Sequence, residues 1–319
     1  MKGKIAVTAA LCALLEMILA PQQMIDSARY ALRLCAELII PSLFPFFVVS
    51  GLLSRLGFSA RLAGRLSRPA ARLYGISGAG ATALFMGLIG GYPLGAAYIA
   101  DMRRQGLISA EEGERLMGFC NNSGPAFLIG SIGAGVFGSA RLGLGLYIIH
   151  ILSALITGLF FRGSGRYKAQ LRHLPESRGP ALIDSVRQAA QSILSVCGFI
   201  VCFCVIIGLM DAGGYFSLLV GRLASLTGLE LHAARALLSG LLELGSGIGA
   251  MRGLSPSPVN LAIAAGIVGW GGVSVHFQTY AVLAESDIKG DLHLTGRLIC
   301  CAVSSALGYI FGLFYKIIC

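Results

Sequence analysis

Long apolar stretches alternate with short polar ones along almost the whole chain. At about 20 residues each, they are long enough to cross the ~30 Å hydrocarbon core of a bilayer as helices. Their apolar residues are continuous rather than alternating, which excludes a transmembrane β-barrel. We predict helical segments at 3–20, 31–54, 76–100, 117–138, 141–161, 190–210, 233–250, 258–284 and 294–317. The pattern therefore predicts an all-α, polytopic membrane protein.

The composition agrees with this class. Of the 319 residues, 55% are hydrophobic and 13% are charged, whereas a soluble domain carries roughly twice that charged fraction. The net charge of +10 is typical of some nucleic-acid-binding proteins, but most basic residues flank apolar runs, as the positive-inside rule expects. We therefore expect membrane lipid, and no nucleic acid, among the partners of this chain.

The first 25 residues begin with basic side chains and continue as an apolar run, which resembles a signal peptide. No clear small-residue cleavage site follows, and Glu16 interrupts the run. We interpret residues 1–25 as a retained transmembrane helix. Lys2 and Lys4 place the N-terminus in the cytoplasm by the positive-inside rule.

The chain repeats one order of segments. Residues 31–161 run from a long apolar helix through an amphipathic stretch to two Gly-rich, interrupted helices and a final helix, and residues 185–317 follow the same order. Local echoes include GLIGGYPLGAA against GLLELGSGIGA. Such internal similarity is typical of secondary transporters. We predict one repeat at 26–165, a basic cytoplasmic linker at 166–180 and a second repeat at 181–319.

The positions of basic residues indicate that the two repeats are inverted. The amphipathic stretch of the second repeat carries only Arg222, whereas that of the first carries five arginines, Arg55, Arg61, Arg65, Arg68 and Arg72. By the positive-inside rule, these equivalent stretches lie on opposite sides of the membrane. Three apolar segments lie between the first stretch and the equally basic linker, so one segment must be re-entrant.

Polar or Gly/Pro residues interrupt four of the apolar segments, at 90–93, 121–125, 245–249 and 269–272. Non-helical backbone at membrane depth is tolerated only where it is buried in protein or lines a cavity. Helix ends that meet near the midplane can bind a polar solute and a coupling cation, although packing kinks satisfied by neighbouring helices are the alternative. The predicted breaks lie at Gly91, Pro93, Gly124, Pro125, Gly245, Gly247 and Gly271.

Several polar residues in these segments are candidates for solute binding. Glu243 is the strongest, because an acid within a span is a functional candidate by default; the alternative is a protonated, hydrogen-bonded structural residue. A histidine in an apolar segment is more often structural. The full set of candidates is Tyr92, Asn121, Asn122, Ser123, Glu243, Ser246, His276 and Gln278. We predict no metal site and no cofactor other than a coupling ion, H⁺ or Na⁺.

Enzymatic motifs are weak or absent. Residues 133–138 match GxGxxG, but they lie in an apolar segment with no preceding strand. Neither a Walker A nor an HExxH motif occurs. Ser246 and His276 suggest an intramembrane serine protease, but the other motifs of such proteases are missing. We expect that the chain is not an enzyme.

With these motifs in place, the sequence resembles the YlbJ-type sporulation integral membrane proteins of spore-forming Firmicutes. The residues that carry the resemblance are IIPSLFPFFVVSGLL, GLIGGYPLGAA, AEEGERLMGFCNNSGPAFLIGSIGAGVFGS, GLLELGSG and GWGGVSVHFQTYAVL. The resemblance implies two Gate, or nucleoside-recognition, domains, a type also found in concentrative nucleoside transporters and the ferrous iron permease. It also implies a role in spore formation, and it implies no particular substrate.

Together these features predict a multi-pass protein of the plasma membrane. The leading hypothesis is a secondary transporter of a small polar solute, with its site between two inverted repeats. The alternative is a non-transporting scaffold that recruits sporulation partners through its basic stretches. Homo-oligomers or other sporulation membrane proteins are the further partners to expect.

Overall fold

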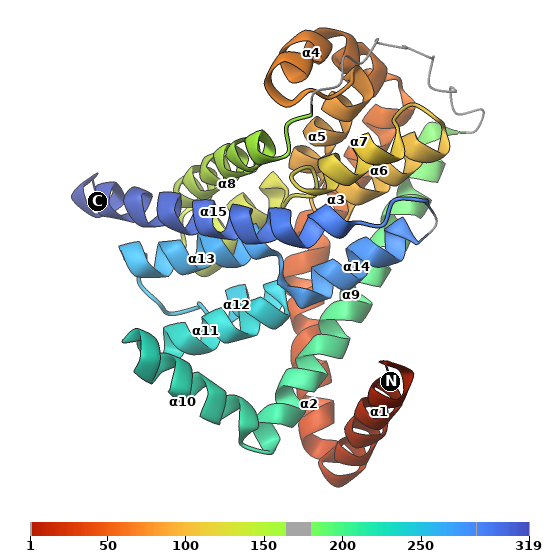
Figure 1. Cartoon of the computed structure of the whole chain (residues 1–319). Coiled ribbons are helices and arrows are strands. Elements are labelled where there is room, and N and C mark those ends of the chain that lie inside the picture. The colour runs from red at the N-terminus through yellow and green to blue at the C-terminus, as the bar shows by residue number, and fades with distance from the viewer. Residues whose placement is uncertain (1, 164–179, 285, 319) are drawn as a thin grey trace.

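In the computed structural model, residues 2–163, 180–284 and 286–318 are described, and their regular structure is helical throughout (Figure 1). The first repeat contains α2 (Pro21–Leu34), η1 (Cys35–Ile39), α3 (Ile40–Arg55), α4 (Phe58–Tyr74), α5 (Gly78–Gly90), α6 (Leu94–Arg104), α7 (Ala110–Met117), η2 (Ala126–Val136) and α8 (Ala140–Phe160), preceded by α1 (Lys2–Leu19). The second contains α9 (Ala181–Ala212), α10 (Tyr215–Thr227), α11 (Leu231–Leu242), α12 (Leu244–Gly249), α13 (Pro258–Trp270), α14 (Gly272–Leu283) and α15 (Asp291–Ile318).

Within the described residues, four spans are long and apolar enough to cross a membrane: Ala140–Phe160, Ala181–Ala212, Pro258–Leu283 and Asp291–Tyr315. Two bent helix pairs raise this number to six if each counts as one span. The first joins Pro21–Ile39 to Leu43–Leu53 with a bend of 52°, and the second joins Gly64–Tyr74 to Gly78–Gly90 with a bend of 95°. The predicted all-α membrane fold is thus confirmed.

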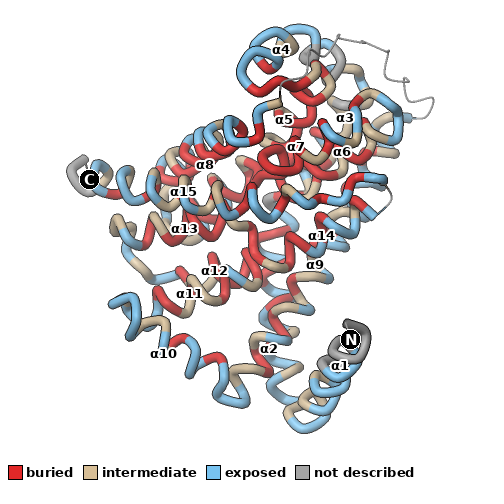
Figure 2. The backbone as a smooth tube through the Cα atoms, in the orientation of Figure 1, coloured by how far each residue is buried: buried red, intermediate tan, exposed pale blue. Residues whose placement is uncertain are grey.

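The N-terminal segment differs from the prediction in its boundary. The first helix ends at Leu19, and residues 21–25, which we assigned to it, belong to α2. Pro21 occupies the first turn of α2, where a residue without an N–H is tolerated, although it cannot continue a preceding helix. Helix α1 lies at the edge of the molecule and is largely exposed (Figure 2). The predicted linker, residues 166–180, lies almost entirely outside the described residues.

The long first helices of the two repeats run antiparallel. Arg55 at the end of α3 lies 3.6 Å from Asp184 at the start of α9 (guanidinium N to carboxylate O). At the other end, Ser27 of α2 lies so close to Gly208 of α9 that a Cβ on the glycine would be 1.8 Å from the serine Oγ. These helices occupy equivalent places in the two predicted repeats, and their antiparallel course is the one that inverted repeats require.

The amphipathic helices α4 and α10 lie at opposite ends of the molecule (Figure 1). Each is preceded and followed by a glycine with positive φ, namely Gly57 and Gly75 around α4 and Gly214 and Gly228 around α10. Glycine adopts this left-handed conformation at no steric cost, so it is the usual residue for a sharp chain reversal at a helix end. The same device thus directs the chain into and out of both helices.

Helices α5 and α6 form a hairpin. A Cβ on Gly87 of α5 would be 3.3 Å from the Cα of Gly95 of α6, so the two arms touch through backbone. The backbone N–H of Ser77, just before α5, donates to Glu112 Oε1 of α7 over 2.6 Å, and α7 follows α6 after a short loop. The hairpin contains one of the Gly/Pro-interrupted segments among which we predict the re-entrant one, and that assignment stays a prediction.

Helices α11 and α12 form the corresponding hairpin of the second repeat. A Cβ on Gly247 would be 2.2 Å from the Cα of Gly240. The two arms are therefore in direct backbone contact, as small residues permit in membrane helices. In both repeats the hairpin depends on glycines at the crossing point.

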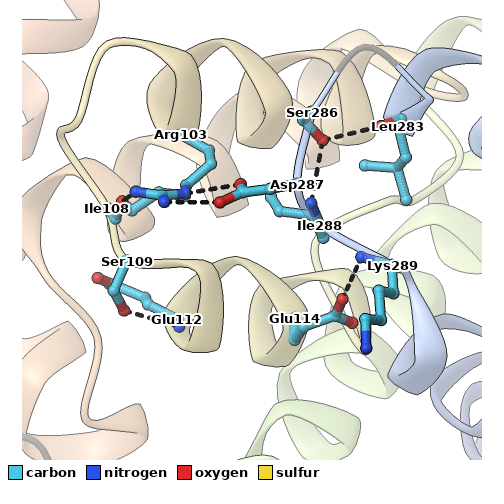
Figure 3. Close-up of polar contacts among 10 residues, drawn as sticks. All are labelled: Arg103, Ile108, Ser109, Glu112, Glu114, Leu283, Ser286, Asp287, Ile288 and Lys289. Atoms are coloured by element: carbon cyan, nitrogen blue, oxygen red, sulfur yellow. Dashed lines mark hydrogen bonds and ion pairs between the residues drawn. The ribbon is translucent and has the colours of Figure 1, made fainter.

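Polar contacts join α6 and α7 of the first repeat to the loop before α15 of the second (Figure 3). The Arg103 guanidinium donates to both carboxylate oxygens of Asp287, over 2.8 and 2.7 Å, and it holds the pKa of Asp287 below its usual value. The Glu114 carboxylate accepts from the backbone N–H groups of Lys289, Gly290 and Asp291. Glu114 thereby caps the N-terminus of α15 from the other repeat.

The backbone contact within the second hairpin yields a testable prediction. Substitution Gly247→Ala places a methyl group against Gly240, and we expect a loss of stability of about 1–3 kcal/mol from overpacking. Gly198→Ala in α9 is the matched control, because nothing lies within 4 Å of the added Cβ. Thermal unfolding of the purified protein in detergent measures both, and equal melting temperatures for the two variants contradict the proposed contact.

The Glu114 cap yields a second prediction. Glu114→Ala leaves three N–H groups at the start of α15 without their acceptor, and we expect a loss of about 0.5–2 kcal/mol, as for other helix caps. The neighbouring Glu111, which is exposed, provides the control variant Glu111→Ala. Hydrogen exchange at residues 289–294 should accelerate in the first variant and stay unchanged in the second; unchanged exchange in both would show that Glu114 does not cap α15.

Candidate functional site

Four interruptions of the helices define the candidate site. Break 1 comprises residues 91–93, break 2 residues 118–124, break 3 Glu243 and break 4 Gly271. Gly91 and Gly271 have φ values of 82° and 91°, which only glycine adopts readily. Pro93 and Pro125 come immediately before α6 and η2.

Break 3 lies two residues before the predicted position. Gly245 and Gly247, which we expected to interrupt the helix, belong to the short helix α12. Glu243 leaves the helical conformation instead, with φ −142° and ψ 120°. Its carboxylate accepts from the backbone N–H of Gly245 over 2.8 Å and from that of Ser246. The acid thus caps α12 and satisfies the backbone donors that the break exposes.

The four breaks converge. A Cβ on Gly91 would be 3.0 Å from the backbone N of Gly124, which brings break 1 against break 2. A Cβ on Gly272, just after break 4, would be 2.9 Å from the backbone N of Leu244, just after break 3. The two pairs meet across the repeats, because a Cβ on Gly271 would be 3.4 Å from Cζ of Tyr92.

A cavity with about 460 Å³ of atom-free space, part of it open to the outside, lies where the breaks meet. Its polar side chains are Tyr92, Ser123, Glu243 and Gln278, and its other walls are mostly apolar: Ile39, Leu43, Gly91, Gly124, Phe127, Val196, Ile200, Leu244, Gly245 and Val275. A concave space with apolar walls and few polar groups is typical of small-molecule sites. Four of the eight predicted binding residues therefore line one cavity.

Gln278 differs from the other polar side chains of this cavity in its hydrogen bonding. The residue is 4% exposed, and its Oε1 has no hydrogen-bond partner among the described residues. A buried acceptor without a donor costs about 1–3 kcal/mol. A bound molecule with an N–H or O–H group would remove that cost.

Asn121 and Asn122 are fully buried and do not line the cavity. The Asn121 amide donates to Thr279 Oγ1 of α14 over 2.8 Å, and its oxygen accepts from the backbone N–H of Ala96 over 3.4 Å. Asn122 donates to the Phe119 carbonyl over 2.7 Å. Both amides belong to break 2 and are hydrogen-bonded within the protein.

His276 and Ser246 also lie outside the cavity lining. His276 Nδ1 lies 3.0 Å from His293 Nε2, and its ring is 4.3 Å from that of Trp270, centroid to centroid. Ser246 Oγ lies 2.9 Å from Cys204 Sγ. Ser246 instead lines a second, partly open space of about 830 Å³ between α2, α9, α11 and α12.

Two important residues were not among the predicted site residues. His150 of α8 accepts the backbone N–H of Ser123 at its Nε2 over 3.0 Å, and Arg297 of α15 is fully buried beside Tyr92. Arg297 lies near the start of an apolar segment, where we attributed basic residues to membrane orientation. A charge within such a segment is the signal that identifies it.

The site contains no evident metal centre. Within the described part of the chain, no three or more His, Cys, Asp or Glu side chains are grouped so that they could hold a metal ion. The paired His276 and His293 have no carboxylate or thiolate recorded with them.

Comparison with known proteins defines first the class and then the family. A solved structure of a CNTnw variant, a concentrative nucleoside transporter, in an outward-facing state superposes with a TM-score of 0.56 at 13% sequence identity, covering 97% of this chain and 85% of that one. The chain therefore has the fold of these membrane transporters. No protein-family model matches it.

A curated relative identifies the family. The chain is 32% identical over 307 residues to the sporulation integral membrane protein YlbJ of Bacillus subtilis (strain 168), which covers 88% of this chain and 75% of the relative. The chain belongs to the YlbJ family of sporulation integral membrane proteins, as its motifs indicated. Neither this relative nor the matched transporter is an enzyme.

Two variants test whether the Asn121 amide stabilises the fold while the Gln278 side chain lines the cavity. Asn121→Ala removes the acceptor of the Ala96 N–H and the donor to Thr279, so we expect a loss of about 1–3 kcal/mol. Gln278→Ala removes an oxygen that has no protein partner, so its effect on stability should be much smaller. Thermal unfolding of both variants decides the matter, and a larger loss for Gln278→Ala would reverse the assignment.

Proposed function

We propose that this protein is a secondary transporter of a small polar solute, nucleoside-like or another metabolite, that acts in the plasma membrane during sporulation. The observation that supports it is the cavity at which the interrupted helices of both inverted repeats meet. Transporters with this architecture bind their substrates at the interface of the repeats. The family and the fold agree with this function without naming the solute.

The cavity suggests which chemical features the solute carries. Its apolar walls, such as Phe127 and Ile200, suit a flat or weakly polar face. Gln278 Oε1 offers an acceptor to an N–H or O–H group, and the Ser123 side chain lines the same space. A molecule with one apolar ring and several hydrogen-bonding groups, as in a nucleoside, satisfies both requirements.

Glu243 is the proposed binder of the coupling ion, H⁺ or Na⁺. It is 2% exposed, lines the cavity and caps α12. A change in its charge therefore acts at once on the cavity and on the hairpin tip. Movement of the hairpins against the long helices would then expose the cavity to alternate sides of the membrane.

The geometry favours this function over intramembrane proteolysis. Ser246 contacts Cys204, and His276 contacts His293, so each proposed protease residue has a different neighbour. Ser246 lines the second cavity, whereas His276 is not part of its lining. We therefore propose that the protein is not an enzyme.

We place the α4 end of the molecule and the N-terminus in the cytoplasm. Arg65, Arg68 and Arg72 of α4 are exposed there, where basic residues are retained by the positive-inside rule. The same face is available to a homo-oligomeric partner or to other sporulation membrane proteins. A scaffold function would depend on these arginines rather than on the cavity.

Ligand binding provides the direct test. Thermal unfolding of the purified protein with nucleosides, amino acids and dicarboxylates should identify a stabilising ligand, because a ligand that prefers the folded state raises its stability. We expect Gln278→Ala and Glu243→Gln to weaken that stabilisation at least roughly tenfold in apparent Kd, as loss of about 1.4 kcal/mol requires. The exposed Glu230 provides the control Glu230→Gln.

A spore-formation assay distinguishes the transporter hypothesis from the scaffold hypothesis. In a sporulating strain that lacks its own homologue, the wild-type gene should restore spores, Glu243→Gln should not, and a double variant Arg65→Ala/Arg68→Ala should. The opposite pattern, with the arginines required and Glu243 dispensable, would overturn the transporter and support the scaffold.

A further inference from the structure

Arg297 is a fully buried cation with no acidic partner. The residue is 0% exposed in the interior of the molecule, and no carboxylate of the described residues forms an ion pair with it. Its Nε has no hydrogen-bond partner there either. A guanidinium keeps its charge in proteins, and burial of an unpaired charge is costly. Something other than a carboxylate must stabilise this charge.

The stabilising groups are neutral oxygens at breaks 1 and 2. Arg297 Nη1 donates to Tyr92 Oη over 2.9 Å, and Nη2 donates to Asn122 Oδ1 over 3.4 Å. The guanidinium also lies 6.0 Å from the centre of the Tyr92 ring, within the range of a cation–π interaction. The Tyr92 hydroxyl in turn donates to the Val268 carbonyl over 3.0 Å.

These contacts link the cation, directly or through Tyr92, to residues at helix ends. Tyr92 follows the end of α5, and Val268 lies in the last turn of α13. Gly296 lies against the end of α7, since a Cβ there would be 1.8 Å from the Gly118 carbonyl oxygen. A helix carries roughly half a negative charge at this end, and the hydrogen bonds through Tyr92 Oη connect the end of α13 to the guanidinium.

The carboxyl ends of interrupted helices are where transporters of this kind hold a coupling cation. We propose that Arg297 is a tethered cation that replaces a free one at breaks 1 and 2, so that the transporter needs no Na⁺ at this position. The role rests on the proposed function, whereas the test below measures stability alone. Tyr92 also lines the cavity, so the hydrogen bond that it accepts from Arg297 stabilises part of the cavity wall.

Removal of the side chain should create a cation site. Arg297→Ala should lower the melting temperature by roughly 5–10 °C, because it leaves a cavity and removes the donor to Tyr92 and Asn122. Methylguanidinium at low millimolar concentration should restore much of the loss. Na⁺ should also stabilise this variant, relative to choline at equal ionic strength, more than it stabilises the wild-type protein, in which only Glu243 is proposed to bind a coupling ion.

Two further variants complete the design. Arg297→Lys retains the charge and should stay insensitive to Na⁺, while Arg297→Gln, which retains length without charge, should acquire the Na⁺ response even if Arg297→Ala does not fold. Arg235→Ala is the matched control, because Arg235 pairs with Asp211 over 2.9 Å and is 38% exposed in its side chain. Methylguanidinium should not restore its stability.

The proposal is overturned if Arg297→Ala and Arg297→Gln respond to neither cation, or if the wild-type protein shows a Na⁺ response of the same size. Neither outcome depends on a solute. Loss of the Glu243 and Gln278 effects on ligand binding would instead overturn the proposed function and leave the tethered cation standing.

Discussion

Backbone groups at the interrupted helices must find partners without water, and much of the structure follows from this requirement. An unsatisfied N–H or C=O in hydrocarbon costs several kcal/mol. At break 3 the Glu243 carboxylate accepts two N–H groups, and at break 2 His150 accepts the N–H of Ser123. Asn121 accepts from the first turn of α6. Polar side chains in these apolar segments are therefore required first by the backbone.

That requirement separates two kinds of polar residue at the centre of the molecule. Asn121 and Asn122 are bonded within the protein, so they maintain the shape of the breaks. Gln278 lines the cavity with an unbonded oxygen, so it is available to a ligand. Glu243 belongs to both kinds, because it caps a helix and also lines the cavity.

The sequence predicts the membrane class, the inverted repeats and the re-entrant hairpin, because these depend on apolar length, on charge placement and on Gly/Pro interruptions. It does not predict which polar residues meet. Arg297 contacts Tyr92 from 205 positions away, and Asn121 contacts Thr279 from 158 positions away, so no local pattern reveals either pair. The position of break 3 was wrong by two residues because the glycines that follow Glu243 are compatible with helix once the acid caps them.

The Glu114 cap on α15 has a consequence for biogenesis. Its three backbone donors are synthesised about 175 residues later, and the Thr279 hydroxyl that Asn121 contacts is synthesised 158 residues later. The first half is therefore synthesised before these contacts with the second half can form. For the same reason, the two halves produced as separate polypeptides should accumulate only when both are expressed together.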